Sequence, residues 1–221
     1  MFISSWSGGK DSCFACYKAL RSGFKVTHLI NFISKEYQRV SFHGIKKSLI
    51  QAQAELAGIP LLQKETTPGN YESEFKEAVE SLLPIGIKGM VFGDIYLDEH
   101  KQWVERVCGE LGLEAIEPLW ERHTEDLMRE YIENGFRAVV VSAQANLVDK
   151  EWIGKPVDMD FIEYLKKKPE IDLCGEKGEY HTLVVGCPMF KGSIKITEQE
   201  VIDRQGYRFL DVKDYTVVRS S

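Results

Sequence analysis

The stretch that decides the fold is Phe2-Ile3-Ser4-Ser5-Trp6-Ser7-Gly8-Gly9-Lys10-Asp11-Ser12. Its first half is strand-like, and from Lys10 to Ser22 apolar residues recur at helical spacing, with Gly23 as the stop signal. A glycine turn therefore joins a strand directly to a helix. At such a junction the unpaired N–H groups and the helix dipole favour an anion, and glycine lets a phosphate approach the backbone closely. We expect residues 7–12 to bind phosphate.

This loop differs from two common phosphate-binding motifs. A Walker A loop requires glycine where Ser4 stands, and it requires serine or threonine where Asp11 stands. The spacing also departs from G-x-G-x-x-G. The alternative without a function is a glycine-rich turn capped by serine and aspartate.

Strand-like and helical segments alternate along the next 130 residues. The strand-like segments are 2–6, 26–33, 59–63, 89–92, 114–116 and 137–142, and the helical segments are 10–22, 45–57, 71–83, 98–111 and 124–133. This alternation predicts an α/β fold, a Rossmann-like parallel sheet of about six strands with helices on both faces. Such sheets bind ligands beyond the carboxyl ends of their strands.

The pattern changes near residue 146. One further helix is expected over 158–168, and strands then follow over 180–186, 192–196 and 207–218. We therefore expect two domains: a nucleotide-binding domain over 1–146, and a smaller α+β domain over 147–221 that binds the substrate.

Composition narrows the class of protein. Of 221 residues, 43% are hydrophobic and 28% are charged, which is typical of a folded globular chain. No apolar run reaches the roughly 18–20 residues of a membrane span, and the first residues lack the pattern of a secretory signal. The net charge of −6 argues against a nucleic-acid partner, because duplex binding needs a basic face.

The five cysteines favour a reducing, cytoplasmic location, since an odd number in a chain of this length does not form a disulfide framework. Cys13 and Cys16 form one C-x-x-C pair, and zinc would need a second pair. The two thiols are either packed one helical turn apart or form a redox pair.

A second motif is Cys174-Gly175-Glu176-Lys177-Gly178-Glu179-Tyr180-His181-Thr182. It combines two carboxylates, two glycines and an aromatic ring where a turn enters a strand. Such a turn suits a cation, an amine or Mg²⁺. An acidic surface hairpin is the alternative.

Both motifs resemble known families. The loop at residues 7–12 resembles the S-G-G-x-D-S loop of the N-type ATP pyrophosphatases, which have an adenine nucleotide alpha hydrolase-like fold, and residues 174–182 resemble C-G-E-G-G-E-Y-E-T of the diphthine–ammonia ligase family. Lys177 and His181 depart from that pattern. The resemblance covers residues 1–190 and includes Ser41-Phe42-His43-Gly44, Gly93-Asp94-Ile95, Glu105-Arg106-Val107-Cys108 and Glu117-Pro118-Leu119-Trp120.

The resemblance implies an ATP-dependent amidation. Elongation factor 2 carries diphthine, a modified histidine with a carboxylate. The ligase adenylates that carboxylate, and free ammonia displaces AMP to give diphthamide. Two alternatives stay open: another enzyme of this superfamily, such as a tRNA-thiolating one, and a nucleotide-binding regulator without catalysis. A homo-oligomer is also left open.

The resemblance also implies site residues. Asp11, through water, would hold Mg²⁺, and Lys10 falls on a variable position of the loop. The nucleotide would be bound by Ser7, Gly8, Gly9, Asp11, Ser12, Leu29, Asn31, His43, Gly93 and Arg106. The catalytic residues would be Asp11, Ser12, Asp94, Glu176 and Glu179. The substrate would be bound by Glu99, Glu176, Gly178, Glu179, Tyr180 and Thr182. Each of three residues also has a non-functional alternative: Asp94 as a turn residue, Arg106 as a solvated charge on a helix, and His43 as a half-buried histidine.

Overall fold

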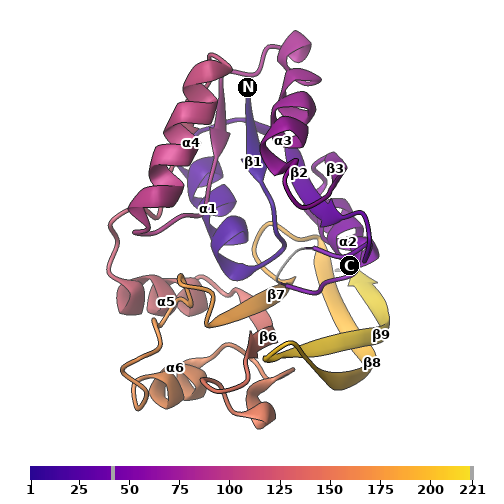
Figure 1. Ribbon diagram of the computed structural model, residues 1–221, viewed down its shortest axis with the longest axis vertical. Helices are drawn as coiled ribbons and strands as arrows, with labels where there is room; N and C mark the ends of the chain where they lie inside the picture. Colours follow the sequence, from indigo (N-terminus) through magenta and orange to yellow (C-terminus); the bar gives the residue numbers. More distant parts are fainter. Residues whose placement is uncertain (41–42, 220–221) are drawn as a thin grey trace.

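The computed structural model describes residues 1–40 and 43–219, so the matching residues Ser41 and Phe42 lie outside the described residues. A five-stranded parallel sheet forms the upper half of the molecule (Figure 1). Its order is β3-β2-β1-β4-β5, and the strands are β1 (Phe2–Ser5), β2 (Val26–Ser34), β3 (Leu61–Thr66), β4 (Gly89–Val91) and β5 (Glu114–Ile116).

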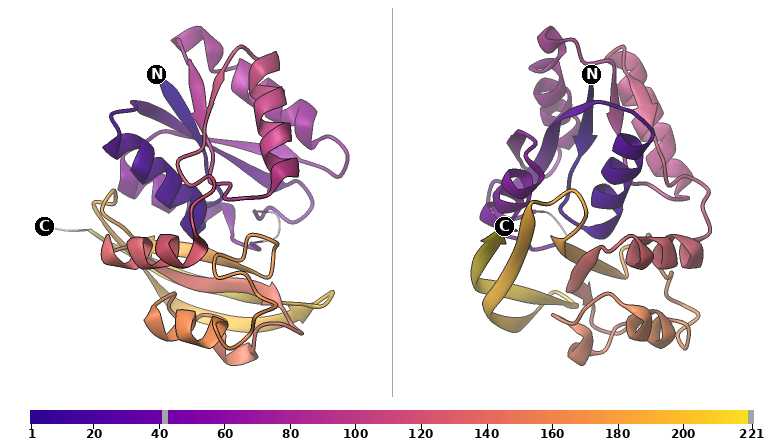
Figure 2. Two further views of the ribbon diagram at one scale, coloured as in Figure 1. Left: turned by 90° about the vertical axis from the view of Figure 1, so that its left-hand side faces the viewer. Right: turned by 180° about the vertical axis from the view of Figure 1, so that it is seen from behind.

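Helices cover both faces of this sheet, as Figure 2 shows. α1 (Lys10–Arg21) and α2 (Lys47–Ala57) share one apolar core with Leu29. α3 (Tyr71–Glu80) and α4 (Asp98–Glu110) share the other core with Ile30, and a short 3₁₀ helix, η1 (Leu83–Ile85), follows α3. Neighbouring residues of β2 thus enter opposite cores, because strand side chains alternate between faces. The predicted α/β fold is confirmed.

A four-stranded antiparallel sheet forms the lower half, in the order β7-β6-β9-β8 (Figure 1). Its strands are β6 (Arg137–Gln144), β7 (Tyr180–Gly186), β8 (Gly192–Arg204) and β9 (Tyr207–Arg219), accompanied by α5 (Thr124–Glu133), η2 (Lys150–Trp152) and α6 (Met159–Leu165). The prediction that a smaller part with both helices and strands follows the first sheet is confirmed. Among the described residues, no helix is long and apolar enough to cross a membrane.

The prediction of a sixth parallel strand over 137–142 is wrong, because β6 pairs antiparallel with β7 and β9. Its apolar run Val139-Val140-Val141 suits the centre of either kind of sheet, since a buried strand is apolar on both faces. The chain therefore leaves the parallel sheet before β6 begins. The domain boundary expected between residues 146 and 147 stays a prediction.

The two halves meet where the parallel strands end. β7 is an edge strand of the second sheet, and the Val184 N–H donates to the Gly8 carbonyl across 2.9 Å. The phosphate loop predicted from sequence therefore covers part of an otherwise open strand edge.

Candidate active site

Side chains of the protein pack tightly against the glycine loop at residues 7–12. Gly8 has φ +80°, and a Cβ there would lie 2.4 Å from Ile50 Cδ1. A Cβ on Gly9 would lie 2.9 Å from His43 Nε2. The positive φ at Gly8 therefore favours glycine, and a side chain at position 9 would press against His43.

The two serines of the loop bond to each other and to its backbone. Ser7 Oγ and Ser12 Oγ are 3.1 Å apart, Gly9 N donates to Ser7 Oγ, and Ser12 Oγ donates to the Gly9 carbonyl. These hydroxyls hold the turn at the start of α1, where the N–H groups of a helix lack helical partners.

Lys10, which sequence analysis left without a role, joins the two halves. Its N–H donates to Thr182 Oγ1 across 2.9 Å, and its Nζ donates to both Asp11 carboxylate oxygens and to the Cys174 carbonyl. The side chain is only 3% exposed. Burial alone would lower the pKa of Lys10, but the adjacent Asp11 carboxylate, with smaller contributions from Tyr180 and Cys174, leaves the pKa raised. Lys10 is therefore a buried cation.

Gln53 of α2 supports the loop from the interior. Its Nε2 donates to the carbonyls of Gly8 and Val184, at 3.0 and 2.7 Å, and its Oε1 accepts from Trp6 Nε1 at 3.0 Å. It is fully buried, although it is polar. Sequence analysis missed it, and the available signal was a glutamine on the apolar face of a predicted helix.

A cavity of about 220 Å³ opens in front of the loop, and both halves line it. Its lining residues are Ser5, Ser7, Lys10, Asp11, Ser12, His43, Gly93, Asp94, His100, Gly175, Glu176, Tyr180, His181 and Thr182. The 174–182 segment thus lies against the loop, where we expected it.

Glu176 and Asp94 bring acidic groups to this cavity. Glu176 Oε1 accepts from the Ile95 N–H across 2.8 Å. Burial first, and then the negative charge of Asp11, raise the pKa of Glu176 to about 7. Asp94 Oδ1 lies 3.0 Å from His100 Nδ1, a partner that sequence analysis did not identify.

His43 and His181 also line the cavity, with ring centroids 4.5 Å apart. Burial, with a smaller contribution from the nearby His43, lowers the pKa of His181 to about 2, so this imidazole is neutral. A neutral donor thus stands where the family pattern has glutamate.

Glu179 does not face the cavity, contrary to our expectation. It is 3% exposed, and its two carboxylate oxygens accept from the N–H groups of Asp172 and Lys177 at 2.9 and 3.0 Å. A carboxylate inside a tight turn satisfies backbone N–H groups that would otherwise be buried without partners. Glu179 therefore shapes the turn, together with Gly178 at φ +79°.

Arg106 lies away from the cavity as well. Its guanidinium bonds Glu72 and Glu110 on the exposed side of α3 and α4, at 2.5 and 2.8 Å. This matches the alternative of a solvated helix charge. Glu99 is exposed on the first turn of α4 and is not among the cavity-lining residues.

The two β2 residues expected beside adenine are part of the interior. Leu29 is fully buried in the core, and Asn31 Nδ2 donates to the Trp6 carbonyl across 2.8 Å. Neither lines the cavity. An adenine contact through their backbone groups stays a prediction.

The C-x-x-C pair is packed inside the protein. Cys13 and Cys16 are both fully buried, and burial raises the pKa of Cys16 to about 12 and that of Cys13 well above its usual value. A nucleophilic cysteine needs a thiolate. The geometry therefore favours packing over redox chemistry.

Fold and site together define a class. A glycine loop at the carboxyl edge of a 3-2-1-4-5 parallel sheet, facing a cavity with a buried lysine and carboxylates, is typical of a nucleotide-binding α/β enzyme. The model of the diphthamide synthase N-terminal domain matches residues 2–115, and that of the diphthamide synthase C-terminal domain matches residues 123–218. The chain belongs to the diphthamide synthase family and is an enzyme of the ligase class.

Relatives support this assignment. The diphthine–ammonia ligase of Bos taurus is 30% identical, over 93% of this chain and 86% of that protein, and the Homo sapiens protein of the same name is 29% identical over the same shares. A solved structure described as a predicted subunit of tRNA methyltransferase, from Methanocaldococcus jannaschii, has 16% identity and a TM-score of 0.45, and covers 85% of this chain and 98% of its own. That likeness is too weak to inform fold or function.

Proposed function

We propose that this enzyme amidates the carboxylate of diphthine on elongation factor 2, using ATP and ammonia and releasing AMP and pyrophosphate. The observation that carries the proposal is the shared cavity: the anion-binding loop at residues 7–12 and the acidic 175–182 segment line the same space. A phosphate donor and a carboxylate acceptor can therefore meet there. The cytoplasm, where elongation factor 2 works, is the proposed location.

The β and γ phosphates of ATP would bind the loop. The start of α1 supplies N–H groups, and the buried ammonium of Lys10 supplies a positive charge. The Lys10 N–H donates to Thr182 Oγ1 in this structure, so a phosphate oxygen that takes this N–H must displace the threonine. Nucleotide binding would then loosen one contact between the two halves.

The chemistry explains why adenylation comes first. A carboxylate is a poor acyl donor because its leaving group would be oxide, whereas an acyl adenylate releases AMP. Lys10 would balance the charge that grows on the departing pyrophosphate. Water must be excluded because it would hydrolyse the adenylate.

Mg²⁺ would enter with the nucleotide. In the part of the chain that the structure describes, no group of three or more His, Cys, Asp or Glu residues could hold a metal ion. Mg²⁺ usually keeps several waters and phosphate oxygens and needs only one or two carboxylates. Asp11, which is 35% exposed, fits this requirement through water, and the ion would neutralise phosphate charge.

The acceptor site would recognise the trimethylammonium of diphthine by charge. Asp94 and Glu176 are the acidic groups that line the cavity near the 93–95 turn. Tyr180 is only 2% exposed, and Lys10 Nζ lies 5.4 Å from its ring centroid. Recognition would therefore rest on the carboxylates, and not on an aromatic face.

A sulfur-transfer function on tRNA is less well supported. That chemistry requires a reactive thiol, and the cysteine nearest the loop, Cys13, is fully buried with a raised pKa. The excess of acidic residues also disfavours a nucleic-acid surface.

The test is direct. Purified protein is incubated with diphthine-bearing elongation factor 2, ATP, Mg²⁺ and ¹⁵N-ammonium, and the modified peptide is analysed by mass spectrometry. The expected product carries one ¹⁵N in place of the carboxylate hydroxyl, with equal amounts of AMP and pyrophosphate. AMP formation that depends on tRNA and not on elongation factor 2 would contradict the proposal.

A further inference from the structure

His100 and Asp94 form a hydrogen-bonded pair at the rim of the cavity. Both residues line it, and Asp94 Oδ1 lies 3.0 Å from His100 Nδ1. A carboxylate can only accept, so Nδ1 carries the hydrogen and the second ring nitrogen, Nε2, keeps its lone pair. The imidazole side chain is 57% exposed, so small molecules can reach it.

The pair is held by contacts from both halves of the molecule. Asp94 lies three residues after the end of β4, and His100 is in the first turn of α4. Glu176, from the second half, accepts from the Ile95 N–H across 2.8 Å and so fixes the residue next to Asp94. The position of the pair therefore depends on the same segment that closes the cavity.

The proposed reaction requires a proton acceptor that the loop does not provide. When ammonia attacks the acyl carbon, a C–N bond forms and the C–O bond to AMP breaks, with AMP keeping the electron pair. The nitrogen must then lose one proton to become an amide. Lys10 and Asp11 are bonded to each other, and His181 is a weak base, because burial lowers its pKa to about 2.

We infer that His100, oriented by Asp94, accepts the proton that ammonia loses as it attacks the acyl adenylate. The inference rests on the proposed amidation. The proton moves from the attacking nitrogen to His100 Nε2 and then to solvent. His100 is thus a catalytic residue in the amidation step, and Asp94 is the residue that positions it.

The charges around His100 suit a base. The acidic groups that face it are Asp94, Glu176 from the second half, and Glu99 from its own helix. The hydrogen bond to Asp94 contributes most, and together these groups raise the pKa of His100 above 6.5. The neutral, accepting form therefore grows as pH rises through that raised pKa.

The experiment measures adenylation and amidation separately in the His100→Gln variant. Diphthine-dependent exchange of labelled pyrophosphate into ATP measures adenylation, and ¹⁵N incorporation measures amidation. We expect exchange to persist and amidation to fall by about 10²-fold, since a positioned base contributes roughly 10²–10⁴-fold. Hydroxylamine should restore product formation in part, because its nitrogen is less basic than that of ammonia and gives up its proton to water more readily after attack.

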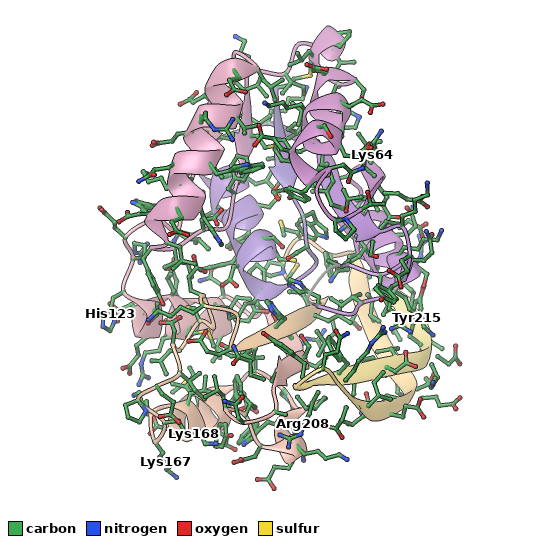
Figure 3. The ribbon with its side chains drawn as sticks, in the orientation of Figure 1. Lys64, His123, Lys167, Lys168, Arg208 and Tyr215 are labelled. Atoms are coloured by element: carbon green, nitrogen blue, oxygen red, sulfur yellow. The ribbon has the colours of Figure 1, made fainter. Side chains whose placement is uncertain are left out.

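The matched control is His123→Gln. His123 is also exposed and lies 3.8 Å from an aspartate, Asp126, but it points outward at the start of α5 (Figure 3). This variant should keep wild-type rates in both assays. The Asp94→Asn variant should move the ascending limb of the amidation pH profile to lower pH, because the carboxylate no longer raises the pKa of His100.

Two results would overturn the inference and leave the proposed function standing. Amidation by His100→Gln at the wild-type rate would show that another group accepts the proton. Equal losses of exchange and amidation would show that His100 acts in nucleotide binding or folding. A wild-type enzyme that forms neither product with elongation factor 2 would refute the proposed function itself, and this inference with it.

Discussion

Replacing Gln53 with leucine tests whether the buried amide holds the glycine loop at residues 7–12. Leucine has a similar size but makes no hydrogen bonds. The substitution leaves Trp6 Nε1 and the Val184 carbonyl without the partner that Gln53 provides, whereas the Gly8 carbonyl still accepts from the Val184 N–H. Two buried polar groups therefore lose their partner.

The expected cost follows from those two groups. Each buried group without a partner costs about 1–3 kcal/mol, which gives about 2–6 kcal/mol in total. Burying the leucine side chain offsets about 1–2 kcal/mol of this. We expect the free energy of unfolding to fall by about 3 kcal/mol, which lowers Tm by about 6–12 °C for a chain of this size.

Thermal and urea denaturation, followed by circular dichroism, measure this change. The control is Gln51→Leu on the same helix, because Gln51 is exposed and its side chain donates to Glu55 at the surface. The control should stay within about 0.5 kcal/mol of wild type. If Gln53→Leu also stays that close, the three hydrogen bonds do not hold the loop and the reasoning is refuted.

Further substitutions test individual residues. Asp11→Ala should abolish AMP formation, measured by chromatography, and should lower Tm because the buried Lys10 ammonium loses its partner. Replacing Cys13 and Cys16 together with alanine should leave the rate of AMP formation unchanged, and a loss of activity with ATP binding intact would instead support sulfur transfer. Arg106→Ala should leave the Kd for ATP unchanged in calorimetry, because its ion pairs are exposed and far from the cavity. For Glu176, the folded pKa of about 7 lies above the ordinary 4.5, so the folded state binds the proton more tightly and wild-type stability falls as pH rises between these values. Urea unfolding of Glu176→Gln should show a smaller fall over that range, and an unchanged slope would mean that Glu176 titrates normally.

Local sequence patterns predicted the first sheet well. The glycine turn, the helical periodicity and the buried strands are all short-range signals, and each describes the residues that form the element. The pairing of β6 was not predictable in this way, because Val139-Val140-Val141 is apolar whichever strands flank it. Pairing partners are decided by distant parts of the chain.

The site shows the same limit. Side chains bound to nearby backbone, such as the serines of the loop, follow from the motif. Glu179 and Arg106 stand at positions to which the family resemblance gives a function. In the structure, however, the Glu179 carboxylate bonds the backbone of a turn, and the Arg106 guanidinium bonds carboxylates of α3 and α4. His100 was missed because its partner Asp94 is six positions away, across the turn that enters α4.

The contact between Gly8 and Val184 limits how these enzymes can be recombined. The loop belongs to the region matched by the N-terminal family model, whereas Val184 belongs to the region matched by the C-terminal one. A chimera that exchanges the C-terminal region to obtain a new acceptor must keep the outer backbone edge of β7, or the loop loses its support. Transplanting the C-terminal region alone would leave that edge bare and prone to pair with other chains. A redesign that aims at a different acceptor should therefore substitute side chains around the cavity and keep the contact between Gly8 and Val184.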